Sequence, residues 1–117
     1  MSSLDLFRTG VNTAAYAAGD TIFEEGEPGD EMYLVKEGRV NIQVEGQTVN
    51  SVGAGEIFGE MALISSDPRS ATAVAASDCT LLPVNEERFL FLVQQTPYFS
   101  LHVMGVLAER LRTQVKP

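Results

Sequence analysis

The feature that most constrains this chain is a series of short segments in which apolar and polar residues alternate. The clearest is RVNIQVE at residues 39–45, where Val40, Ile42 and Val44 share one face and polar side chains share the other. A period of two residues is typical of a half-buried β-strand. Further candidate strands are TIFEE, EMYLVKE, QTVNSV, SATAVAA and CTLLPV.

Turns rich in glycine and proline separate these segments. They include GEPGD, EGR, EGQ and GAGE, and Gly46 lies where a hairpin could reverse between Val44 and Val49. Many short strands at regular spacing favour an antiparallel β-roll, or jelly roll, over a parallel sheet with crossover helices. We therefore expect strands over residues 11–85.

The periodicity changes after this region. Asn85 can cap a helix beginning at Glu86, whose acidic side chain complements the helix dipole. Thr96 and Pro97 are typical of the cap and first residue of a second helix. Apolar residues then recur at helical spacing as far as Val115.

The chain length of 117 residues suits one domain with one hydrophobic core. We expect a mainly β fold in three parts: a helical turn at 1–10, the β-roll at 11–85 and C-terminal helices at 86–117. No apolar run approaches the roughly eighteen residues of a membrane helix, and no secretory signal is visible. We therefore expect no membrane partner. The single cysteine excludes a disulfide within the chain, which fits a cytoplasmic protein.

Composition argues against several functions. The net charge of −8 should repel polyanions, so nucleic acid is not an expected partner. His102 is the only histidine, so the chain cannot form a metal site with several histidine ligands. A Ser-His-Asp or Cys-His catalytic site would need this same histidine, so we do not expect one. We expect His102 on a helix surface or at an interface, and Cys79 as a small buried residue. Neither metal, cofactor nor enzymatic activity is expected.

FGEMALISSDPRSATA, at residues 58–73, concentrates the candidate binding residues. Arg69 is the only basic residue within 40–87, and its guanidinium matches two oxygens of one phosphate. A helical turn starting after Gly59 would present backbone N–H groups to an anion, and a glycine lets a ligand approach closely. Ionised Glu60 can only accept hydrogen bonds, for example from sugar hydroxyls.

These residues alone leave two interpretations open. An arginine, a carboxylate and a helix N-terminus together describe a site for a nucleotide-like ligand. Alternatively, Glu60 and Arg69 form an internal ion pair that only closes a loop, which is a common and weakly stabilising arrangement.

From about Val11 to Leu111 the chain resembles cyclic nucleotide-binding domains of the cAMP receptor protein and protein kinase A regulatory subunit superfamily. Residues 58–73 resemble the family's phosphate-binding cassette, roughly F-G-E-hydrophobic-A-L, a short turn, then P-R-small-A-T. GDTIFEEGEPGDEMYLVKEGRV resembles its second to fourth strands. The resemblance implies a β-roll with one short helix in the cassette and with cAMP or cGMP as the ligand.

The resemblance also implies a role for each cassette residue. Arg69 would clasp the cyclic phosphate, and Glu60 would hold the ribose 2′-hydroxyl. Gly59 and Ala71 match positions that offer backbone N–H groups, and Ser70 matches a position whose hydroxyl touches the phosphate or the base. The candidate ligand-binding residues are Phe58, Gly59, Glu60, Met61, Ala62, Arg69, Ser70 and Ala71.

The expected function is a cyclic nucleotide sensor whose helices rearrange on binding, read by a second copy of the chain or by an effector protein. The alternatives are the sensory part of a cAMP receptor-type transcription regulator, a part of a cyclic-nucleotide-gated channel or kinase, and a structural β-roll without ligand. Because the sequence reaches Pro117 without room for a recognition helix, we expect no DNA contact through this chain.

Overall fold

The computed structural model describes residues 13–64, 67–95, 98 and 101–106 of the chain. Three sequence predictions concern other segments and lie outside the described residues: the helical turn at 1–10, the helix start at 96–97, and the end of the last helix at 107–117. Of the described helices, none is long and apolar enough to cross a membrane.

The fold consists of short strands with two labelled helices. In chain order the elements are β1 (Ala14–Tyr16), β2 (Thr21–Phe23), β3 (Glu31–Glu37), β4 (Val40–Val44), β5 (Gln47–Val52), β6 (Ile57–Phe58), α1 (Met61–Ile64), β7 (Thr72–Ala75), β8 (Cys79–Asn85) and α2 (Glu86–Gln95). Residues 101–106 form a further helical segment.

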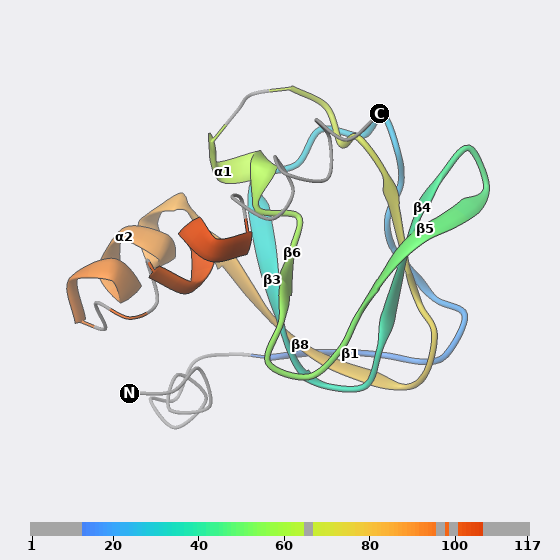
Figure 1. Ribbon diagram of the computed structural model, residues 1–117, viewed down its shortest axis with the longest axis horizontal. Helices are drawn as coiled ribbons and strands as arrows, with labels where there is room; N and C mark the ends of the chain where they lie inside the picture. Colours follow the sequence, from blue (N-terminus) through green and yellow to red (C-terminus); the bar gives the residue numbers. More distant parts are fainter. Residues whose placement is uncertain (1–12, 65–66, 96–97, 99–100, 107–117) are drawn as a thin grey trace.

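The strands form two four-stranded sheets, with the orders β1-β8-β3-β6 and β2-β7-β4-β5. Every neighbouring pair is antiparallel. Figure 1 shows α2 beside the first sheet and the β4–β5 hairpin at the opposite side of the molecule. The predicted antiparallel β-roll is confirmed, and the arrangement is an open roll of two sheets rather than a closed barrel.

The core follows the most apolar strands. In β3 the consecutive residues 32–35 are all buried, since β3 lies inside its sheet between β8 and β6. The predicted alternation in β4 is weaker than expected. Val40 is buried, but the polar residues Asn41 and Gln43 are partly buried, just as the apolar Ile42 is. Strand β4 lies between β7 and β5 rather than at an edge of its sheet, so neighbouring strands flank it on both sides.

The predicted hairpin at Gly46 is confirmed. The two residues between β4 and β5, Glu45 and Gly46, have φ angles of 52° and 81°. Positive φ at both positions is typical of the type I′ turn, whose twist matches that of the flanking strands, and glycine adopts this conformation without strain.

The helix predicted after the strands begins at Glu86, as expected. The backbone N–H of Arg88 donates to Oδ1 of Asn85 over 2.8 Å, so Asn85 is the N-cap. Helix α2 contacts β8, and Leu92 of α2 joins the buried cluster of the first sheet. The helices thus cover the outer side of this sheet (Figure 1).

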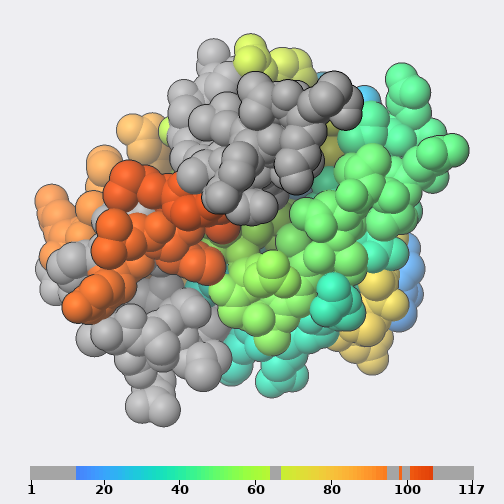
Figure 2. Space-filling view, viewed as in Figure 1, coloured from blue at the N-terminus to red at the C-terminus, as the bar shows by residue number. Residues whose placement is uncertain are grey.

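The helical segment 101–106 divides its apolar residues between core and surface. Val103 is buried in the same cluster as Leu92, whereas Leu101 and Met104 are 59% and 55% exposed. Figure 2 shows this segment, in orange-red, on the surface of the viewed face. His102 is exposed, as predicted for a helix-surface residue. Pairing of the exposed residues with a second chain stays a prediction.

Candidate functional site

The cassette begins with a sharp change of direction. Strand β6 ends at Phe58, and Gly59 then takes a φ of 74°, a conformation that side chains disfavour. The helical turn α1 follows, with Ala62 N–H donating to the Gly59 carbonyl oxygen and Leu63 N–H to that of Glu60. The predicted short helix after Gly59 is therefore confirmed.

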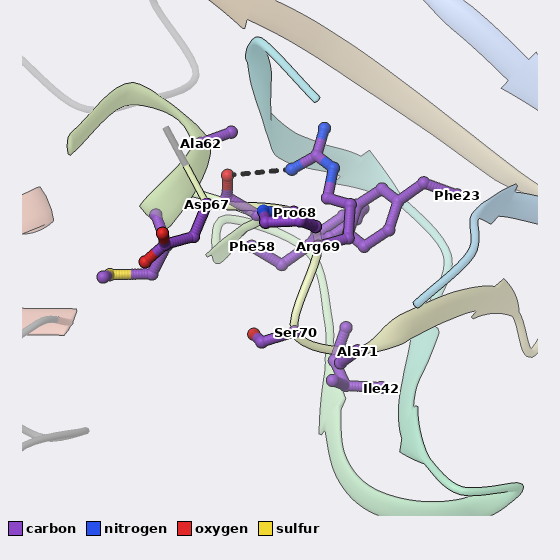
Figure 3. A pocket seen from close by; sticks show the side chains of 11 residues that line it. Phe23, Ile42, Phe58, Ala62, Asp67, Pro68, Arg69, Ser70 and Ala71 are labelled. Atoms are coloured by element: carbon purple, nitrogen blue, oxygen red, sulfur yellow. Dashed lines mark hydrogen bonds between the residues drawn. The ribbon is translucent and has the colours of Figure 1, made fainter. Parts of the chain in front are cut away.

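A cavity of about 130 Å³ lies against this segment. Its lining includes all but one of the candidate residues named from the sequence: Phe58, Gly59, Met61, Ala62, Arg69, Ser70 and Ala71. Glu60 does not line it; this side chain is buried, with 1% of its surface exposed. Figure 3 shows Ser70 and Ala71 on the segment that follows Arg69, with Ala62 on the helical turn across from them.

The lining also includes residues that the sequence pattern does not single out as binding residues, namely Phe23, Ile42, Asp67 and Pro68. Phe23 and Ile42 lie on β2 and β4, the two neighbours of β7, and both pair with Ala73 of that strand. Since β7 directly continues the cassette, sheet pairing brings these side chains to the cavity. No local spacing in the sequence carries that information.

Arg69 is held by its main chain and by its side chain. Its backbone N–H donates to the Glu27 carbonyl oxygen, and its own carbonyl oxygen accepts from Gly26 N–H, both over 2.8 Å. Its Nη1 donates to the Gly59 carbonyl oxygen over 3.2 Å, and its Nη2 to that of Glu31 over 2.8 Å. The arginine thus ties β3 and the turn before it to the cassette.

These contacts bear on the loop-closing alternative. The hydrogen bonds identified for the Arg69 guanidinium go to main-chain carbonyl oxygens, of Gly59 and Glu31, which hold two segments together. Arg69 therefore has a structural role whatever binds in the cavity. The cavity beside it shows that the same group is also placed where a ligand could reach it.

Three aromatic rings cluster at the cavity, and two of them, Phe23 and Phe58, line it. Tyr33 and Phe58 stack with centroids 5.2 Å apart, and Phe23 lies 6.0 and 5.9 Å from them. Burial, followed by the nearby Tyr16 and Glu31, raises the pKa of Tyr33 from 10.0 to about 12. The folded state therefore favours the neutral phenol.

Alkaline unfolding should report on this phenol. As pH rises, the unfolded chain loses the tyrosine proton near pH 10 and the folded chain near pH 12, so stability present below pH 10 is lost across this window. The slope is on the order of 1 kcal/mol per pH unit. Tyr33→Phe should lose less free energy of unfolding over that window than the parent. Urea titrations at several pH values measure this, with the exposed Tyr98→Phe as control. Parallel losses in parent and Tyr33→Phe would contradict the account.

The family model described as "Cyclic nucleotide-binding domain" matches residues 13–96. The chain belongs to this family. The "Cyclic AMP receptor protein" of Thermus thermophilus is 37% identical over 114 residues, covering 93% of this chain and 53% of that protein. A "Cyclic nucleotide-gated potassium channel" of Rhizobium etli is 42% identical over 93 residues, covering 80% and 26%.

The fold agrees with this membership. The crystal structure of the Thermus thermophilus catabolite activator protein matches with a TM-score of 0.80 and 36% identity, over 95% of this chain and 55% of that one. The chain spans about half the length, or less, of the curated relatives it matches. The chain is therefore a domain of the cyclic nucleotide-binding type. The proteins that share this domain with it differ in name and in length.

Proposed function

We propose that this chain binds a cyclic nucleotide, with cAMP preferred over cGMP, and acts as a sensor module. The observation that carries the proposal is the position of Arg69, the only basic side chain among the described residues that line the cavity of the cassette. A guanidinium fork matches the two exocyclic oxygens of a cyclic phosphate. Backbone N–H groups at Gly59 and Ala71 complete the phosphate contacts in this proposal.

The remaining lining residues suit a base and a sugar. Ile42, Phe58 and Met61 are apolar, and a predominantly apolar lining with few polar groups is typical of small-molecule sites. Glu60 accepts a hydrogen bond from the ribose 2′-hydroxyl in this proposal. Because its carboxylate is buried, the cassette must adjust when the nucleotide enters.

The same packing offers a route from the ligand to the helices. Leu63 of α1 packs against the buried cluster that contains Leu92 of α2 and Val103 of the helical segment 101–106. A displacement of the cassette would therefore change the packing of both helical elements. We propose that a second copy of the chain or an effector protein in the cytoplasm reads this change, with a transcription regulator, channel or kinase as the alternative settings.

Calorimetric titration with both nucleotides tests the proposal. We expect both to bind, with cAMP tighter by less than about a hundredfold, because one neutral hydrogen bond contributes only about 0.5–1.5 kcal/mol. The Thermus relative's name supports this order. If neither nucleotide binds the folded protein, the proposed function is wrong and the ligand-free β-roll gains support.

Ser70 should influence the preference. Its side chain lines the cavity, and its hydroxyl can accept a hydrogen bond from the exocyclic amino group of guanine, which cAMP lacks. Ser70→Ala should therefore weaken cGMP more than cAMP, by up to about tenfold. Ser77→Ala, which removes a hydroxyl outside the cavity, serves as the control. Equal losses for both nucleotides would mean that Ser70 serves the phosphate alone.

A further inference from the structure

We propose that Phe23 is a positioning residue for Arg69, so that its aromatic ring sets the affinity of the site for the phosphate group. This inference rests on the proposed function. It gives a role to a residue of β2 that lies outside the cassette and that the sequence pattern did not single out.

Hydrogen bonds satisfy the Arg69 side chain only in part. Nη1 and Nη2 donate to the carbonyl oxygens of Gly59 and Glu31. Nε is buried and has no hydrogen-bond partner within the described part of the chain. A cation that is removed from water with an unsatisfied donor needs compensation from its surroundings.

The ring of Phe23 supplies such compensation. Cζ of Arg69 lies 4.0 Å from the ring centroid, well inside the roughly 6 Å range of a cation–π contact. This contact strengthens when the cation is desolvated, as the burial of Nε indicates here. Figure 3 shows the Phe23 ring beside the Arg69 side chain. An aliphatic side chain of similar size would cover the guanidinium without this attraction.

The ring is itself fixed in orientation. It packs on Tyr33 and on Phe58, which is fully buried. Its backbone pairs with Ala73 of β7, the strand that continues the cassette. Phe23 therefore connects the core to Arg69 and keeps the guanidinium at one side of the cavity before any ligand arrives. Such preorganisation increases affinity because less ordering is required on binding.

A double-mutant cycle tests this role. The affinity for cAMP is measured by titration for Phe23→Leu and Phe23→Tyr, each alone and combined with Arg69→Ala. Phe23→Leu should weaken binding about five- to thirtyfold in the parent, and Phe23→Tyr, which keeps the aromatic face, by less than about twofold. In the Arg69→Ala background, Phe23→Leu should change affinity by less than about twofold, since no guanidinium remains. The exposed Phe91→Leu is the matched control.

Three results would overturn the inference. These are an unchanged affinity in Phe23→Leu, equal losses in Phe23→Leu and Phe23→Tyr, and equal losses in the presence and absence of the Arg69 side chain. The last would mean that the ring contacts the ligand or supports the fold directly. Failure of the proposed function is distinguishable, because the parent protein itself would then bind no cyclic nucleotide, and the inference would fall with it.

Discussion

Arg69→Ala should lower the affinity for cAMP about thirtyfold to several thousandfold while the protein stays folded. The substitution leaves the phosphate without its charged partner in a site partly shielded from water, which typically costs ~2–5 kcal/mol. The main-chain hydrogen bonds of residue 69 to Gly26 and Glu27 do not depend on the side chain, so the cassette keeps its backbone tether. Calorimetry with cAMP and thermal unfolding measure the two effects.

Arg39→Ala is the matched control. The Arg39 side chain donates to the Ser51 hydroxyl and does not line the cavity, so its removal should leave cAMP affinity unchanged. If Arg69→Ala binds cAMP like the parent, its proposed role at the phosphate is wrong. If it unfolds while Arg39→Ala does not, the hydrogen bonds to Gly59 and Glu31 serve mainly to close the fold.

Gly29→Ala should reduce affinity for cAMP about ten- to hundredfold without touching the ligand. A Cβ at this position would lie 2.2 Å from Nε and 2.4 Å from Cζ of Arg69, which is too close for any real contact. Gly29 has no positive φ, so its backbone accepts alanine, and the flexible arginine side chain is the part that must move. The displaced guanidinium would lose its hydrogen bond to Glu31 and its position at the cavity.

Gly105→Ala provides the comparison for this substitution. Nothing lies within 4 Å of a Cβ at Gly105, which is part of the helical segment, so alanine there should preserve affinity. A Gly29→Ala protein with parental affinity would show that Arg69 tolerates a different orientation. In that case the close approach at Gly29 would matter for packing alone.

The sequence predicted most of the fold because local signals and tertiary structure agree. Glycine at the β4–β5 turn, Asn85 as a cap and the apolar run of β3 all specify their own elements. The sequence pattern does not single out β1 and β6, since strands of three and two residues carry no periodicity.

The site was predictable only where it is continuous in sequence. The cassette residues share one segment, and all of those named except Glu60 line the cavity. Phe23 and Gly29 reach Arg69 through the pairing of β2 with β7 and through the turn before β3, which are long-range contacts. The sequence identifies Arg69 as an isolated cation, but it does not show which uncharged groups fix the position of its side chain.

The central claim is that Arg69 meets the phosphate of a cyclic nucleotide in this cavity. A crystal structure of the protein with cAMP measures this most directly. The account predicts an exocyclic phosphate oxygen within about 2.7–3.2 Å of a guanidinium nitrogen of Arg69, with the Phe23 ring still against that group. A nucleotide bound elsewhere, or bound here with its base rather than its phosphate at Arg69, would contradict the account.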